Sequence, residues 1–141
     1  MTDILDLIEI LNDLDIEIEA MDAITATAKD IADYNTDQLM TGHRSDGTKL
    51  PDYRPSSVKD FGKEDGPIKL YDTGDFHKSF RLDFNEDGYT IKADDLYDLE
   101  KRYGENIYGL DDLSQETYNE EEFFPVFANN IEQKTGLKFA Q

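Results

Sequence analysis

An Asp-Gly turn with apolar and polar residues alternating on both sides limits the middle of this chain to one local fold. The apolar residues at every second position are Phe80, Leu82, Phe84, Tyr89, Ile91 and Ala93. Alternation with a period of two places the side chains of each run on one face of extended backbone. Residues 85–88, Asn-Glu-Asp-Gly, supply the turn between the two runs. The sequence therefore predicts a β-hairpin as the basis of a small antiparallel sheet.

Apolar residues at helical spacing run through the first 40 positions. They predict a helix over residues 3–13 and a continuation over residues 14–40. We expect a long N-terminal helix, either in one piece or in two pieces with a bend near residues 12–15. A strand over residues 14–18, where apolar residues alternate with acidic ones, is the alternative.

A C-terminal helix is predicted between Ser114 and Gly136. The residues at helical spacing are Phe123, Phe124, Phe127 and Ile131. Pro125 interrupts this run, so we expect a kink or a helix that restarts there.

A shorter helix is expected between the hairpin and the C-terminal helix. It carries Leu96, Leu99 and Tyr103. Asp94 or Asp95 caps its start, and Gly104 ends it.

Residues 43–70 carry six glycines and prolines together with six of the fourteen lysines and arginines of the chain. A connection this long without regular structure is unusual in a compact domain and is often functional or ordered by a partner. It is predicted to be a long extended arm or loop. The fold class is then α+β in a single domain of 141 residues. Its parts are an acidic helical segment (1–42), the arm (43–70), a turn, hairpin and short helix (71–113), and a C-terminal helix and tail (114–141).

The net charge of −19 argues against a protein that grips nucleic acid through its phosphates. Eleven acidic residues and one lysine lie in the first forty positions. This segment is either a solvated helix face, a wall that repels DNA, or a mimic of DNA. The chain has no cysteine, so disulfides and thiolate metal sites are excluded. The first residues show no cationic region followed by an apolar stretch, and no run approaches membrane-spanning length, so we expect a soluble protein made in the cytoplasm.

No group of residues predicts an active site or a cofactor. The two histidines, His43 and His77, stand in no metal-binding or nucleophile–base spacing. The hairpin turn does match the opening of a calcium-binding loop, with Asp83, Asn85, Asp87 and Asp94 as the candidate ligands. Both flanks alternate like strands where helices are required, so a plain hairpin turn is the favoured interpretation and no metal is expected.

Two segments combine glycines with aromatic residues, and we call them the first (71–80) and second (103–110) glycine–aromatic segments. Their candidate assembly residues are Thr73, Gly74, Phe76, Ser79, Tyr103, Gly104, Tyr108 and Gly109. Each residue alone is explained by a turn, a helix cap or a core position. The ordered combination of the two segments is not explained in this way. It indicates residues that set the geometry of subunit assembly.

The order of features resembles the putative tail-component proteins encoded among the neck and tail-completion genes of tailed phages. The resemblance rests on the turn from Thr73 to Ser79, on residues 46–53 in the arm, and on the second glycine–aromatic segment. The resemblance covers residues 20–135 in outline. The two glycine–aromatic segments, taken together, are similar to versions from phages of gut Bacteroidota, including the crAss-like group. The acidic first helix has no counterpart in it.

This resemblance implies a structural virion protein rather than an enzyme. It would form a homo-oligomeric ring in the head–tail connector, neck or tail, in contact with portal, neck or tail proteins. DNA would pass through the ring without specific binding, and no membrane is involved. The alternative from another class is an acidic inhibitor or DNA mimic that binds a cationic partner.

Overall fold

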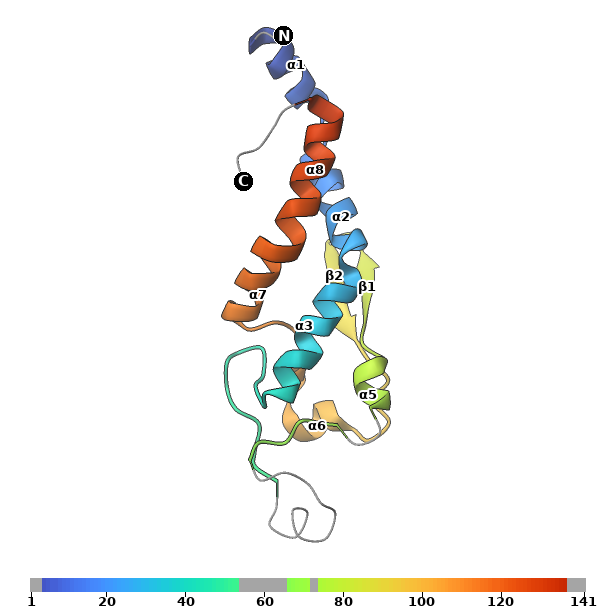
Figure 1. Ribbon diagram of the computed structural model, residues 1–141. Coiled ribbons are helices and arrows are strands. Elements are labelled where there is room, and N and C mark those ends of the chain that lie inside the picture. The colour runs from blue at the N-terminus through green and yellow to red at the C-terminus, as the bar shows by residue number, and fades with distance from the viewer. Residues whose placement is uncertain (1–3, 54–65, 72–73, 137–141) are drawn as a thin grey trace.

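A computed structural model of the chain describes residues 4–53, 66–71 and 74–136, and these ranges form an elongated α+β molecule (Figure 1). The side chains of Leu7 and Leu11 are likewise outside the description.

The N-terminal segment folds as three helices, so the prediction of one long N-terminal helix is wrong. They are α1 (Ile4–Asp13), α2 (Ile16–Ala26) and α3 (Ala28–Met40). The first break falls at the bend proposed near residues 12–15, because the Asp15 carboxylate accepts hydrogen bonds from the backbone N–H groups of Glu17 and Ile18 and starts a new helix. The alternative of a strand over residues 14–18 is also excluded.

Thr27 makes the second break. Its hydroxyl donates to the carbonyl of Ala23 and lies 2.7 Å from the hydroxyl of Tyr118. Threonine hydroxyls that bond back to the preceding turn bend helices. The N–H of Ile31 still bonds to the carbonyl of Thr27, so α3 continues from α2 with a change of direction.

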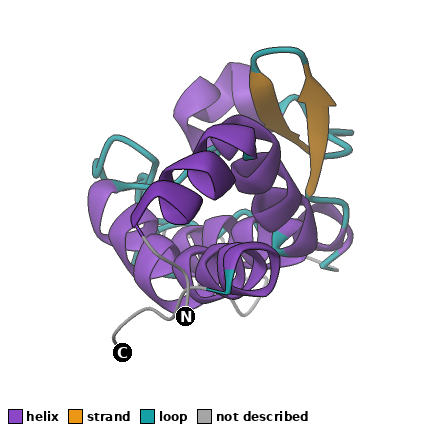
Figure 2. Cartoon of the chain, turned by 90° about the horizontal axis from the view of Figure 1, so that it is seen from above, coloured by secondary structure: helices purple, strands orange, loops and turns teal. Residues whose placement is uncertain are grey.

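The predicted hairpin is confirmed, with β1 (Arg81–Asn85) antiparallel to β2 (Gly88–Lys92). Phe84 pairs with Tyr89, and Asn85 with Gly88, so the turn is the two residues between them. Viewed down the long axis, the hairpin lies at the side of the helices (Figure 2). The described chain contains no other strands, and the sheet therefore has two.

The C-terminal helix is also confirmed, and in place of a restart at Pro125 it continues through an irregular turn just before the proline. Helix α7 (Asp112–Tyr118) passes through a π-helical turn (Asn119–Phe123) into α8 (Phe124–Thr135). Pro125 stands in the first turn of α8, and its missing N–H interrupts the regular hydrogen-bond pattern next to the π-helical turn. Gly136 ends the helix with a left-handed φ of 76°.

The short helix between hairpin and C-terminal helix begins later than predicted. Helix α6 spans Leu99–Tyr103, which leaves Leu96 outside it and 81% exposed. The Asp95 carboxylate does cap it, accepting hydrogen bonds from the N–H groups of Leu99 and Glu100. Leu96 and Tyr97 form a turn ahead of the helix, and Asp98 has a left-handed φ of 55°, so the helix starts only at Leu99.

The helices pack in two antiparallel rows, with α8 against α2 and α7 against α3. Between α2 and α8, the nearly buried Glu19 pairs with Lys134. The hydrophobic core gathers around α3, which contributes Ile31 and Leu39, and it extends to the hairpin and to residue 107. The other buried members are Ala32, Leu50, Leu70, Phe80, Ile91, Ile107 and Tyr118.

The predicted arm is described only at its two ends. A bridge joins His43 to Lys49 and another joins Asp52 to Pro67, while residues 54–65 lie outside the described range. Gly42, with a φ of 81°, lies so close to Pro67 that an added Cβ would overlap its ring. The two described ends of the arm are therefore held side by side at the end of α3.

Candidate interaction site

The first glycine–aromatic segment is a tight joint ahead of the hairpin. Gly74 adopts a left-handed φ of 89° and precedes the single turn of α5 (Asp75–Lys78). An added Cβ at Gly74 would lie 2.9 Å from the hydroxyl of Tyr71. The Tyr71 ring packs edge-on against His77, with ring centroids 5.3 Å apart. Thr73 lies outside the described residues.

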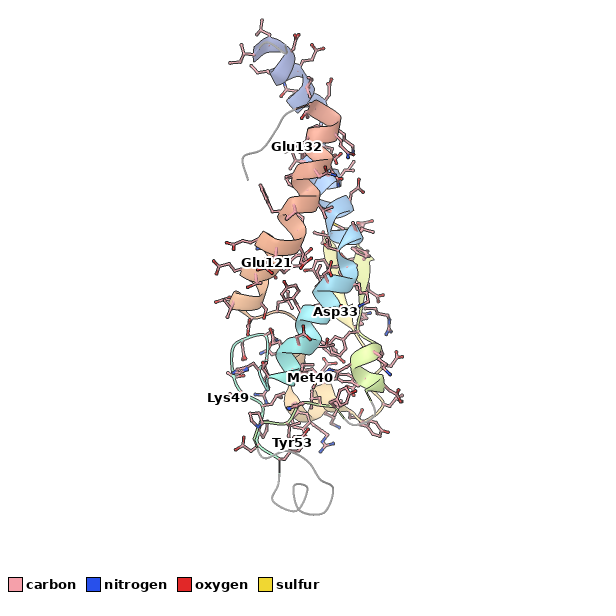
Figure 3. All side chains as sticks on the ribbon, in the orientation of Figure 1. Asp33, Met40, Lys49, Tyr53, Glu121 and Glu132 are labelled. Atoms are coloured by element: carbon pink, nitrogen blue, oxygen red, sulfur yellow. The ribbon has the colours of Figure 1, made fainter. Side chains whose placement is uncertain are left out.

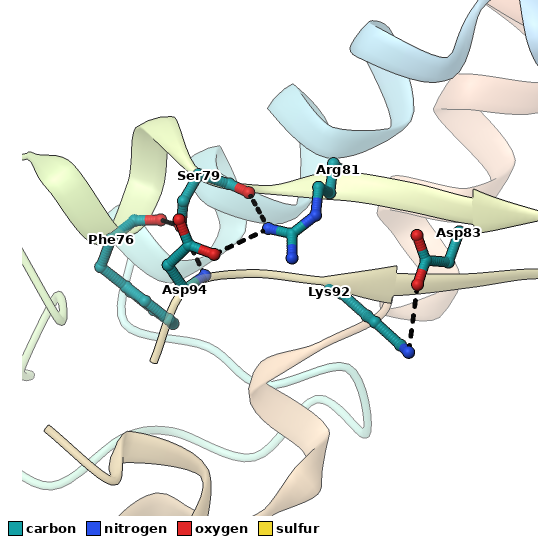
Figure 4. Close-up of polar contacts among 6 residues, drawn as sticks. All are labelled: Phe76, Ser79, Arg81, Asp83, Lys92 and Asp94. Carbon is teal, nitrogen blue, oxygen red and sulfur yellow. Dashed lines mark hydrogen bonds and ion pairs between the residues drawn. The ribbon is translucent and has the colours of Figure 1, made fainter. Parts of the chain in front are cut away.

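Ser79 connects the joint to both strands of the hairpin (Figure 4). Its hydroxyl donates to the carbonyl of Phe76 at 2.6 Å and accepts from the N–H of Asp94 at 2.8 Å. Arg81 then donates both to the carbonyl of Ser79 and to the carboxylate of Asp94, each at 3.1 Å. The start of β1 and the end of β2 are thereby fixed to α5.

The second glycine–aromatic segment is held by two amides on α3. Asn35, fully buried, donates to the carbonyl of Ile107 at 2.9 Å and accepts from the N–H of Gly109 at 2.7 Å. Gln38 donates to the carbonyl of Gly109 at 3.1 Å and accepts from the N–H of Asp111 at 2.7 Å. Together the two side chains pair with four backbone groups of the loop, as a neighbouring strand would.

The described start of the arm holds the other side of this segment. Arg44 donates to the carbonyl of Tyr103 at 2.8 Å, and the N–H of Ser45 donates to the carbonyl of Asn106 at 2.8 Å. Gly109 has a φ of 113°, and a Cβ there would lie 3.1 Å from Ser45. Gly104 also has a positive φ, 95°, where it ends α6.

The two glycine–aromatic segments meet in one aromatic cluster, which we call the aromatic junction. Tyr108 of the second segment lies 6.4 Å from Phe76 and 5.7 Å from Phe80 of the first, measured between ring centroids. Phe76 and Phe80 are themselves edge-to-face at 5.0 Å. Such arrangements are favourable beyond the apolar area they bury. The segments are therefore parts of a single structural unit, 23 or more positions apart in sequence.

Burial changes the ionisation of two residues in this unit. Burial, with smaller contributions from Asp95 and Glu100, raises the pKa of Tyr108 to about 12. Burial lowers the pKa of His77, against the opposing effect of its hydrogen bond to the carbonyl of Lys69 at 2.9 Å. Because a carbonyl only accepts, Nε2 of His77 carries the proton in the neutral ring.

A pocket of about 610 Å³ opens beside the aromatic junction. Its wall is mainly apolar and comes from both ends of the arm, from α5 and from residues 94–103. Its apolar and aromatic members include Ile68, Leu70, Tyr71, Phe76, Leu96 and Tyr97. Leu96 and Tyr97 project at its rim, 81% and 71% exposed. Arg102 also lines the pocket and stacks over the ring of Tyr103 at 5.4 Å.

The candidate calcium ligands lie on or beside the hairpin and engage other protein groups. Asp83 pairs with Lys92 at 3.1 Å, and Asp94 pairs with Arg81 (Figure 4). Asn85 accepts a hydrogen bond from the N–H of Asp87. Strands flank the turn, whereas helices flank a calcium-binding loop of this type. Within residues 4–53, 66–71 and 74–136, no three His, Asp or Glu side chains are grouped to hold a metal ion.

Asn35 and Gln38 were not foreseen as site residues, although a signal for them exists. They follow Ile31 at intervals of four and three on the same face of α3. An amide within an apolar helical stripe indicates a buried polar group that needs partners. Those partners lie more than seventy positions away along the chain.

No family model, curated protein or solved structure matches this chain. In the described ranges, every helix is too short or too polar to cross a membrane.

Proposed function

We propose that this chain is a structural virion protein of a tailed bacteriophage, forming a ring in the head–tail connector, neck or tail around the passage for DNA. The observation that carries the proposal is the aromatic junction, which makes one unit of the two segments on which the resemblance rests. A catalytic role is not part of the proposal.

A rigid joint suits a subunit that must meet its neighbour at a fixed angle. Ser79, Arg81 and Asp94 fix the hairpin to α5, and the aromatic junction fixes α5 to the second glycine–aromatic segment. Closure of a ring by head-to-tail contacts depends on such angles, because a small error in rotation gives an open helix instead.

The hairpin supplies a candidate contact surface. With two strands in the described sheet, β1 and β2 each keep an outer edge. An unpaired edge can accept an extended segment from a neighbour, and the arm over residues 43–70 is the candidate segment. Phe84, 44% exposed near the hairpin tip, adds apolar area to this surface.

Charge is consistent with a DNA passage. Eight acidic residues of the N-terminal helical segment are exposed, namely Asp6, Glu9, Asp13, Asp15, Glu17, Asp22, Asp33 and Asp37. Figure 3 shows acidic side chains along much of the molecule's length, with Asp33 on α3 and Glu121 and Glu132 on the C-terminal row. A wall of this charge repels phosphates, so DNA would slide along it without binding.

The test is to look for the ring in the particle and in the purified protein. Mass spectrometry should detect the chain in purified virions. Electron microscopy should show rings with the hairpin at the subunit interface. A chain that is absent from virions and monomeric in solution would overturn the proposal.

The alternative function, an acidic inhibitor or DNA mimic, is favoured by the net charge of −19. Exposed carboxylates can imitate the phosphates that a cationic groove binds. Inhibition of a DNA-binding enzyme at stoichiometric concentration, relieved by added DNA, would support this alternative. Presence in the virion at ring stoichiometry would count against it.

A further inference from the structure

Helix α1 leaves an apolar face without cover from the described chain. Ile4, Leu5 and Ile8 share one side of the helix and are 72%, 73% and 49% exposed. Asp6, Glu9 and Asp13 give the rest of the helix a negative charge. Side chains of this size are rarely left exposed as a group unless they meet a partner.

The pocket beside the aromatic junction offers a second exposed apolar surface. It is lined mainly by apolar side chains, with Leu96 and Tyr97 at its rim, and Arg102 adds a positive charge. Among the described residues, Arg102 has no carboxylate partner. The lining also holds two carboxylates, Asp75 and Asp94, and Asp94 is paired with Arg81.

The two surfaces lie at opposite ends of the molecule. Helix α1 packs against the far end of α8, whereas α5, α6 and Tyr53 lie at the other end (Figures 1 and 3). Helix α1 therefore cannot reach the pocket of its own chain. A contact between them must join two copies.

We propose that the apolar face of α1 in one copy docks in this pocket on a second copy. Ile4, Leu5 and Ile8 enter between the apolar walls, and the acidic side of α1 faces Arg102. This is the way amphipathic helices bind apolar grooves. The contact joins two different surfaces, head to tail, so it can propagate around a ring. It rests on the proposed ring and names a contact within it.

The experiment uses the full chain and three variants with the same change, each at an exposed leucine. Leu5→Asp alters α1, Leu96→Asp alters the pocket, and Leu113→Asp is the matched control on α7, where the leucine is 73% exposed. Circular dichroism verifies that all three fold. Sedimentation velocity over a concentration series then measures self-association.

The wild-type chain and Leu113→Asp should associate with equal affinity, and each of the other two variants should do so at least about tenfold more weakly. Arg102→Glu should also weaken association by about tenfold, more so at low salt. A mixture of Leu5→Asp and Leu96→Asp retains one intact contact per pair, so it should form heterodimers and nothing larger.

The proposal is overturned if the wild-type chain stays monomeric at all soluble concentrations, or if the mixture pairs no better than its components. Equal weakening by Leu113→Asp would overturn it too. These results are distinct from failure of the proposed function. Virion rings joined only through the hairpin would reject the α1 contact and keep the proposed function. Heterodimers formed by a chain that is absent from virions would support the α1 contact and reject the proposed function.

Discussion

Position 74 requires glycine for two separate reasons. Its φ of 89° is left-handed, and a Cβ there would crowd the hydroxyl end of Tyr71. Gly136 offers a comparison, because its φ of 76° is similar and no atom lies within 4 Å of an added Cβ.

Gly136→Ala should therefore lower the free energy of unfolding by about 1 kcal/mol through backbone strain alone. Gly74→Ala should cost more, about 2–3 kcal/mol, because the Tyr71 ring must also move and lose its contact with His77. Urea denaturation of both variants measures the difference. Equal losses would show that Tyr71 gives way freely.

His77 should make stability depend on pH. Its folded-state pKa lies below the ordinary value of 6.5, chiefly through burial, so the unfolded chain binds a proton first as the pH falls. The stability from neutral His77 is fully present above 6.5 and is lost as the pH falls from there through the folded-state pKa.

The His77→Gln variant keeps an N–H donor for the carbonyl of Lys69 and cannot titrate. Between pH 7.5 and pH 5.5 the wild-type chain should lose more stability than this variant in urea denaturation. Parallel losses would mean that other groups, carboxylates included, account for the whole pH dependence.

At the scale of elements, α3 organises the fold through amides as well as apolar residues. Asn35 is fully buried and pairs with backbone groups of residues 107 and 109. The loop between α6 and α7 therefore takes its shape from α3.

Asn35→Leu keeps the branched outline of the side chain and leaves the carbonyl of Ile107 and the N–H of Gly109 without their partner. We expect a loss of about 2–4 kcal/mol in the free energy of unfolding. Asn129→Leu, at an exposed position of α8, should change it by less than about 0.5 kcal/mol. Similar values for the two variants in urea denaturation would contradict a role for Asn35 in holding the loop.

For the whole molecule, the net charge of −19 should act as self-repulsion. Raising the salt concentration from about 0.01 M to about 0.15 M shortens the screening length from about 30 Å to about 8 Å. The free energy of unfolding of the monomer should then rise by roughly 1 kcal/mol.

The double variant Glu120→Gln and Glu121→Gln removes two exposed charges, and it should show a smaller rise. Thermal unfolding at dilute protein concentration makes the comparison. A fall in stability with salt would indicate that ion pairs such as Lys29 with Asp33 outweigh the repulsion.

The elements that the sequence determined are those with local causes. The hairpin follows from a period of two and a turn of fixed chemistry, and the C-terminal helix follows from apolar residues at helical spacing. The number of N-terminal helices was not determined, because Thr27 carries no distinctive local signal and its hydroxyl meets Tyr118, 91 positions away.

Only the tertiary structure decided how the two glycine–aromatic segments relate. Their glycines and aromatic residues are visible in the sequence, but their meeting in the aromatic junction depends on α3, whose amides hold the loop from Ile107 to Asp111. Local propensity acts over a few residues, whereas these bonds and ring contacts join parts of the chain that only packing brings together. The pocket and the exposed face of α1 arise in the same way, from what the packed elements leave uncovered.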